Sequence, residues 1–215
     1  MSMTTKKICV LGMLSAIAFL LAAFARVPVV LFLRYDPKDV IITLGGFIYG
    51  PMAALAIAVI VSVVQMFTVS ATGFYGLVMN IVASASFCCT AAYIYQKNRS
   101  LKGAVIGLIV AALATTAVMM AWNYLIAPIY MGRPRSEIVG LLIPAFLPFN
   151  LLKGSLNAAF TLLLYKPIKG ALQAARIMPP AEESSKTRIN AGVIIASIFV
   201  IVTCILWIMM LQDWL

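Results

Sequence analysis

Asn150 and Lys153 are polar residues in a stretch that otherwise has the composition of a membrane span, since Lys153 is the only charged residue from Ile143 to Tyr165. A charged group at membrane depth is costly, so it normally faces a protein-lined cavity on a substrate or ion path. Residues three apart share one face of a helix, and Pro148 suits its first turn. The pattern predicts a recognition site in which the Lys153 ammonium group donates hydrogen bonds and the neighbouring Asn150 amide both donates and accepts them. The alternative is a lysine that snorkels from a helix end.

The overall composition is that of an integral membrane protein. Hydrophobic residues make up 64% of the 215 residues and charged residues 10%, which lies far outside the range of soluble domains. Lys6 and Lys7 precede an apolar run, as in a signal peptide, but the apolar pattern continues into further spans, so we expect this run to be the first helix. The net charge of +10 comes from basic residues that cluster in loops. This fits membrane orientation and not nucleic-acid binding.

Seven apolar stretches predict an all-α, polytopic membrane fold, since about 20 apolar residues span a bilayer. They are Ile8–Ala25, Asp39–Tyr49, Met52–Ser70, Tyr75–Tyr95, Leu101–Ile126, Ile143–Tyr165 and Ile189–Leu211. The second is too short to span, and we expect it to line a cavity within the protein. Linkers are expected at Tyr130–Gly140 and Ile177–Arg188. The chain then divides into a substrate-binding membrane domain (1–176), a cytoplasmic linker (177–188) and an additional C-terminal transmembrane helix (189–215).

The distribution of Lys and Arg over the loops predicts a cytoplasmic N-terminus, because this orientation places about twice as many cations inside as outside. It also places the C-terminus outside the cell. Three polar clusters then lie toward the external side of the membrane: Tyr35–Asp39, Trp122–Tyr124 and Asn150–Lys153. We therefore expect a pocket that opens outward.

Small residues recur along the first helix at Gly12, Ala16, Ala18 and Ala22. Small side chains let the backbones of two membrane helices approach closely, so these residues predict a docking surface. A partner protein and packing within the same chain are equally compatible with the pattern.

The groups needed for catalysis or for energy coupling are missing from the sequence. It has no histidine, and its four cysteines lie in apolar runs without the spacing of a ligand set, so we expect no metal site. No ATP-binding G-x-x-x-x-G-K-[ST] loop occurs. None of the six acidic residues lies deep in a long span, whereas ion-coupled carriers usually hold carboxylates there. We expect a binding subunit without cofactor or enzymatic activity that takes energy from a partner.

An ordered set of short motifs covers residues 8–168. They are Met13–Phe19, Asp36–Val40, Tyr49–Pro51, Asn80 with Ala85–Phe87, Asn123-Tyr124 with Pro128 and Tyr130, and Pro148–Gly154. In order and spacing the set resembles the S components of energy-coupling factor (ECF) vitamin transporters, most closely the riboflavin-binding type. The last motif is the most specific of them.

This resemblance implies a six-helix bundle with a vitamin pocket that opens outward, to which the stretch from Ile189 adds a seventh helix. The partners it implies are a transmembrane T component, contacted by the small residues of the first helix, and two cytoplasmic ATPases. It implies that Asn123, Asn150 and Lys153 hold the flavin ring.

The third helix departs from the family pattern. Val61 and Ser62 stand where the pattern has a Lys and an Asn, and Gln65 is the nearby polar side chain. The identity of the vitamin and its exact contacts therefore stay open.

A flavin ring is a flat apolar surface with one polar edge, and it suits an apolar cavity with a few polar anchors. Asn amides and a Lys can complement that edge. The candidate walls are Trp122, Tyr124, Phe146 and Phe149, each of which can equally be ordinary packing. The hydroxylated tail has Asp36, Asp39, Thr43 and Gln65 as candidate partners, and Asn80 completes the expected binding residues. The two carboxylates can equally pair with Arg34 or Lys38 at the surface.

Riboflavin capture by an S component is thus the leading hypothesis. An S component for another vitamin or flavin is the nearest alternative. A stand-alone secondary carrier is disfavoured because the sequence lacks the deep titratable residues that such carriers use. A membrane scaffold without a small ligand would leave Lys153 and its Asn neighbours unexplained.

Overall fold

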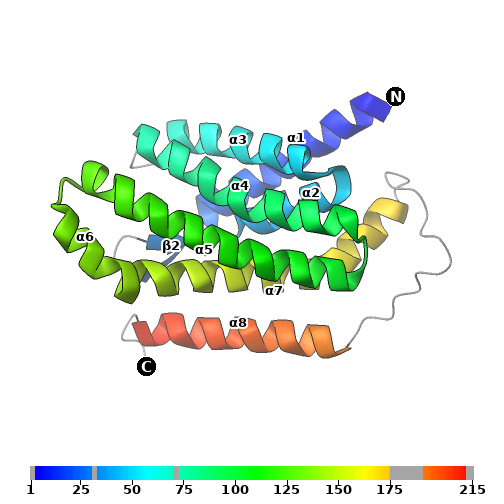
Figure 1. Ribbon diagram of the computed structural model, residues 1–215. Coiled ribbons are helices and arrows are strands. Elements are labelled where there is room, and N and C mark those ends of the chain that lie inside the picture. The colour runs from blue at the N-terminus through cyan, green and yellow to red at the C-terminus, as the bar shows by residue number, and fades with distance from the viewer. Residues whose placement is uncertain (1–2, 31–32, 70–72, 175–190, 212–215) are drawn as a thin grey trace.

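The structure is a computed structural model that describes residues 3–30, 33–69, 73–174 and 191–211. It is an all-α bundle with one small hairpin (Figure 1). The elements in chain order are α1 (Met3–Phe24), β1 (Val27–Val30), β2 (Leu33–Tyr35), α2 (Lys38–Tyr49), α3 (Pro51–Thr68), α4 (Gly73–Lys97), α5 (Leu101–Met131), α6 (Arg135–Leu141), the π-helical segment η1 (Leu142–Phe146), α7 (Leu147–Ala174) and α8 (Ala191–Leu211).

The helices have the lengths of a multi-pass membrane protein. Among the described residues, six helical stretches are long and apolar enough to cross a bilayer, and the continuous run through α6, η1 and α7 counts as one of them. The predicted all-α membrane fold is confirmed. The expected linker at Tyr130–Gly140 is wrong, because α5 continues to Met131 and α6 begins at Arg135. The linker predicted at Ile177–Arg188 lies outside the described residues.

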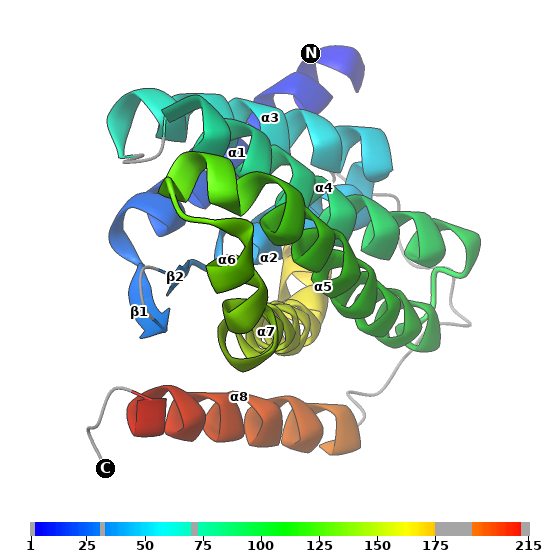
Figure 2. The same cartoon turned by 60° about the vertical axis from the view of Figure 1, so that its left-hand side comes forward.

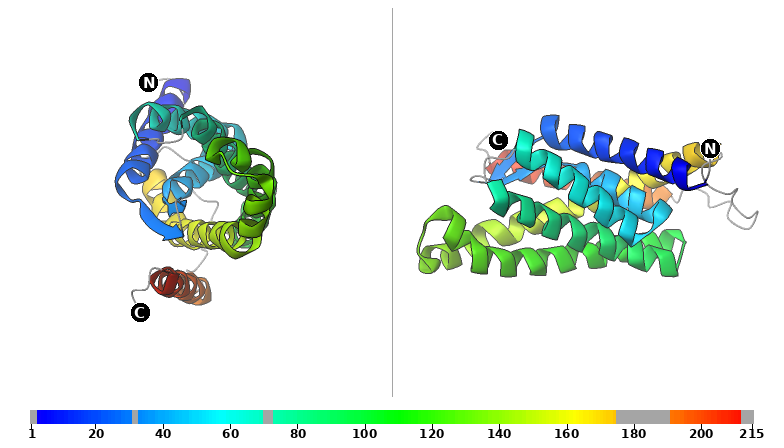
Figure 3. Two further views of the ribbon diagram at one scale, coloured as in Figure 1. Left: turned by 90° about the vertical axis from the view of Figure 1, so that its left-hand side faces the viewer. Right: turned by 90° about the horizontal axis from the view of Figure 1, so that it is seen from above.

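The short helix α2 is the centre of the bundle. It contacts α1, α3, α4 and α7, and its residues from Lys38 to Phe47 are buried. Figure 3 shows α2 enclosed by the longer helices. Twelve residues are too few to span a membrane, and this helix is instead surrounded by protein, as the sequence predicted.

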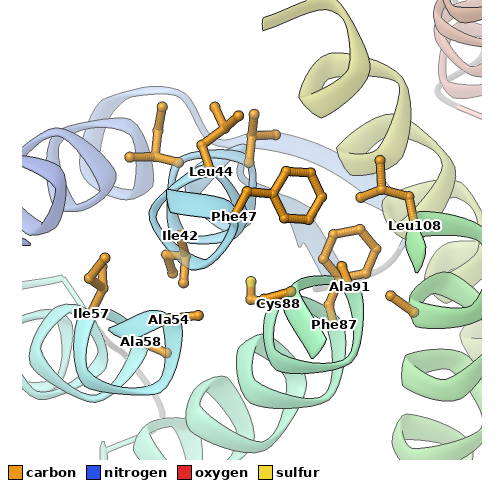
Figure 4. Close-up of a cluster of buried hydrophobic side chains, with 14 of the residues drawn as sticks. Ile42, Leu44, Phe47, Ala54, Ile57, Ala58, Phe87, Cys88, Ala91 and Leu108 are labelled. Atoms are coloured by element: carbon orange, nitrogen blue, oxygen red, sulfur yellow. The ribbon is translucent and has the colours of Figure 1, made fainter. Parts of the chain in front are cut away.

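Close packing around α2 depends on small residues. A Cβ at Gly46 would lie 2.9 Å from the Cβ of Ala92 and 3.0 Å from that of Ala54, so only glycine allows this approach. Gly50 turns the chain from α2 into α3 with φ of +96°, a conformation that favours glycine. Figure 4 shows the resulting cluster, in which the ring of Phe47 points away from α2 toward Leu108 of α5.

The small residues of α1 lie on two different faces. Ala18 and Ala22 are fully buried in the chain, whereas Gly12 and Ala16 are exposed. Ala18 belongs to the cluster around α2, which includes Ile57 of α3. The expectation that Ala18 and Ala22 form a partner interface is therefore wrong, because they pack within the same chain. Gly12 and Ala16 stay candidate contacts for a partner.

The chain reverses between α5 and α7 through α6, which crosses the end of the bundle (Figure 2). A π-helical segment follows directly, and Pro148 lies in the first turn of α7. Single turns of π-helix often occur at functional sites. This one positions the start of α7, on which Asn150 and Lys153 lie.

Candidate ligand pocket

A cavity of about 440 Å³ lies between the hairpin and helices α3, α4, α5 and α7. This volume lies in the range of small-molecule sites, about 300–1,000 Å³. Eight of the residues expected from the sequence line it: Asp36, Asp39, Gln65, Asn80, Asn123, Phe149, Asn150 and Lys153. Segments far apart in the chain thus bring their predicted polar residues to one place.

One face of α7 forms a polar wall of the cavity. Asn150, Lys153, Gly154 and Asn157 all line it, which is the spacing of neighbours on one helix face. The Asn150 amide nitrogen donates to the Phe146 carbonyl over 2.7 Å, so its amide oxygen is left to accept from a ligand. The prediction that Asn150 and Lys153 share a cavity-facing side is confirmed.

Two lysines and two aspartates form a buried charge network at the cavity. Lys38 donates to Asp36 over 3.1 Å, and Lys153 lies 3.5 Å from Asp39 and 4.0 Å from Asp36. Lys38 is completely buried, and Asp39 is 1% exposed. Buried charges are tolerated when they are paired and hydrogen-bonded. The four charges cancel, so the network as a whole is neutral.

Neutral polar groups complete the network. Lys38 also donates to Asn80, Ser84 donates to Asp39, and the amide of Asn157 donates to the other oxygen of Asp39 over 3.5 Å. Tyr35 donates to Asn157 over 3.1 Å and thereby ties the hairpin to α7. These bonds give each carboxylate several partners and fix the geometry of the wall.

The network keeps Asp36 ionised. Burial by itself raises the pKa of this carboxyl group, but the positive charges of Lys153 and Lys38 outweigh burial and lower the pKa to about 2. Pairing of Asp36 and Asp39 with nearby cations was one of the two roles expected for them. Lys38 takes part in it, but in the interior of the protein and not at its surface.

Four predicted residues lie outside the cavity wall. Thr43 is buried in α2 and donates to the carbonyl of Asp39, so it is not available to a ligand. Tyr124 is 41% exposed and contacts Arg135 on the outer side of α5. Trp122 and Phe146 do not line the cavity either, and Phe146 packs against Ile138. The adjacent residue Asn123 does line it, because neighbouring helical residues point in different directions.

Several residues of the network and of the cavity wall were not among those expected from the sequence. Asn157 was detectable, since it continues the Asn150 and Lys153 spacing by one turn. Lys38 is a candidate surface partner in the sequence, but it is completely buried in the structure. Tyr130, which belongs to the helix-five motif but was not among the expected binding residues, also lines the cavity, as do Arg26 and Tyr75, which come from segment ends that no pattern marks.

Two cavity-lining side chains hold buried polar atoms without a hydrogen-bond partner in the described part of the chain. They are the amide oxygen of Gln65 and the hydroxyl of Thr115. Unpartnered buried polar atoms are costly, so both are suited to polar groups of a bound ligand. The site can thus bind and orient a mostly apolar molecule that has several hydrogen-bonding groups.

Comparison with known proteins identifies the family. The model of the ECF transporter substrate-specific component matches residues 6–165, which contain every element of the cavity. The chain belongs to this family. As an S component it is a part of a membrane transporter, and α8 lies beyond the matched region.

Characterised relatives agree with this assignment. The chain is 30% identical over 177 residues to the riboflavin transporter RibU of Staphylococcus aureus, covering 78% of this chain and 93% of the relative. It is 33% identical over 178 residues to the riboflavin transporter FmnP of Bacillus subtilis, covering 76% and 93%. A solved structure described as the S component of a bacterial ECF transporter matches with a TM-score of 0.68 and 32% identity, over 79% of this chain and 99% of that chain.

Proposed function

We propose that this S component captures riboflavin at the extracellular side of the membrane and delivers it with a T component and two ATPases. The observation that carries the proposal is the cavity wall on α7, where Asn150 and Lys153 line the same cavity as Asn123 of α5. The motifs that contain these residues resemble the riboflavin-binding type, and the relatives named above are riboflavin transporters.

The charge balance around Lys153 favours an uncharged part of the ligand beside α7. Lys153 is balanced by Asp36 and Asp39, so an added anion is not needed to compensate its charge. Its ammonium group still has donors for a ring carbonyl, and the Asn amides can meet both donors and acceptors. Phe149, Met119 and Phe87 give apolar surface for a flat ring. Asp36, Gln65 and Asn80 are the proposed partners of the ribityl hydroxyls.

Binding can be tested with the purified full-length protein. Riboflavin fluorescence is expected to be quenched with saturation at one ligand per chain, and protein from a flavin-containing culture is expected to be yellow. Thiamine and biotin serve as controls, since neither offers the flavin edge. Saturable binding of one of these and none of riboflavin would reassign the ligand while keeping the family.

The proposed sidedness has support from the cation distribution and from the arrangement of the fold. The beginning of α1, which carries Lys6 and Lys7, lies at the end of the molecule opposite to the hairpin and the end of α8 (Figure 1). With Lys6 and Lys7 in the cytoplasm, the cavity faces outward and the described end of α8 lies outside.

Accumulation of ligand is expected to require partners and ATP. Proteoliposomes that contain the S component alone are expected to bind riboflavin in proportion to protein and to show no uptake with time. Addition of the T component, the two ATPases and ATP should start uptake. A stand-alone secondary carrier predicts the reverse, namely uptake by the isolated chain that follows a proton or sodium gradient.

A further inference from the structure

The helix α8 lies outside the family match and packs against the wall of the cavity. It crosses α7, contacts it, and reaches β1 (Figures 1 and 2). Its face toward the bundle contains Ser197, Cys204 and Ile208, which are 3%, 7% and 8% exposed, whereas Ile205 is 46% exposed. One face of a uniformly apolar helix is therefore specialised for packing in this chain.

The α8 contact joins the hairpin to α7. Cys204 and Ile208 share one buried cluster with Val29 of β1, Tyr35 of β2 and three residues of α7. Those three are Phe149, Leu152 and Leu156. Phe149 itself lines the cavity, so the cluster is the outer layer of the ligand-binding wall.

Strand and helix geometry place this cluster directly behind the ligand site. Successive residues of a strand point to opposite sides, so Pro28 lines the cavity while Val29 enters the cluster. On α7 the cavity face contains Lys153 and Asn157, and the neighbouring face contains Leu152 and Leu156. The cavity and the cluster thus lie on different sides of the same two segments, β1 and α7.

The hairpin needs such support. It consists of strands of four and three residues with an irregular register, and an isolated two-stranded hairpin is at best marginally stable. One bond from Tyr35 to Asn157 ties it to α7 on the cavity side. The packing of Cys204 and Ile208 holds it from the other side.

We propose that α8 is a clamp on the ligand pocket: Cys204 and Ile208 hold the hairpin against α7 and slow release of the ligand. They are positioning residues, because they reach the cavity only through Val29, Tyr35 and Phe149. The identity of the ligand rests on the proposed function, but the clamp does not. Opening of the hairpin separates it from α8, so loss of this contact favours the open state.

The test compares two isoleucines one turn apart on α8 in the full-length protein. Ile208→Ala removes buried packing, and Ile205→Ala removes the same atoms from a neighbouring side chain that is 46% exposed and lies outside the buried cluster. Riboflavin dissociation in stopped flow is expected to be roughly fivefold to tenfold faster in Ile208→Ala, since a cavity in packed structure is costly. We expect the dissociation rates of Ile205→Ala and of the conservative variant Ile208→Val both to stay close to that of the wild type. Partial misfolding lowers the bound fraction without changing this rate.

A second measurement needs no ligand. Amide hydrogen exchange at residues 27–30 and 33–35 is expected to become faster in Ile208→Ala and not in Ile205→Ala, with α4 unchanged in both. Cys204→Ala, a smaller change, should show the same direction if Ile208→Ala does not fold.

Equal dissociation rates and equal hairpin exchange in the two alanine variants would overturn the clamp. Faster dissociation with unchanged hairpin exchange would also overturn it, because α8 would then act by another route. Faster hairpin exchange in a protein that does not bind riboflavin would support the clamp and refute the ligand assignment.

Discussion

Replacement of Lys153 by Met is expected to weaken riboflavin binding by roughly tenfold to a hundredfold, the range for hydrogen bonds that involve a charged group. Methionine keeps most of the side-chain volume and removes the ammonium group. That group lies 3.5 Å from Asp39 at the cavity wall, so its loss removes a donor to the ligand and also leaves a carboxylate less well compensated. Asn150→Ala should weaken binding by about tenfold, because one neutral hydrogen bond is lost.

Titration of riboflavin fluorescence gives both dissociation constants, and thermal melting in detergent shows that each variant is folded. Lys102→Met is the matched control, since Lys102 is exposed on α5 away from the cavity. Wild-type affinity in folded Lys153→Met and Asn150→Ala proteins would remove these residues from the site.

Replacement of Lys38 by Met is expected to give the largest loss of stability. Lys38 is completely buried and pairs with Asp36 over 3.1 Å. Removal of one partner of a buried ion pair leaves an uncompensated charge and typically costs about 3–5 kcal/mol. For a chain of this size the melting temperature should fall by roughly 10 °C or more.

Two comparisons identify the cause of that loss. The double variant Lys38→Met, Asp36→Asn removes both charges and is expected to recover much of the melting temperature. Arg133→Met breaks the exposed pair between Arg133 and Glu137, which should cost less than about 1 kcal/mol. Equal melting temperatures for Lys38→Met and Arg133→Met would contradict a stabilising role of the buried network.

Neutrality of the network links stability to ligand choice. Because Lys38 and Lys153 are balanced within the protein by Asp36 and Asp39, an uncharged part of the vitamin can lie against this wall without leaving either lysine uncompensated. Lys38 thus mainly serves stability, and Lys153 serves both the network and recognition of the ligand.

Residue types and spacing were enough to predict the membrane class, the long spanning helices and the polar face of α7. Long apolar runs specify spanning helices because a bilayer requires about 20 such residues, and Lys153 within one of them marks a cavity because of the cost of its charge. The family resemblance followed from short motifs in order. These features are local, so they can be detected from residue types and spacing.

Which polar residues meet, and which small residues are covered, depends on contacts between distant parts of the chain. Ala18 and Gly12 have the same character in sequence, but one is buried against the central helix and the other is exposed. Lys38 and Thr43 both belong to α2, which is surrounded by other helices. In this position Lys38 pairs with Asp36, whereas the Thr43 hydroxyl donates to a backbone carbonyl of its own helix. Burial depends on what packs against a face, and no local pattern records that neighbour.

The hairpin and the contact of α8 with it show the same limit. Val27–Tyr35 is too short and irregular to predict strands, and α8 is apolar on every side, so its packing face has no sequence signature. That face became recognisable through its neighbours Val29, Tyr35 and Phe149. In lipid all faces of such a helix are equally apolar, and only shape complementarity with a specific partner selects one of them.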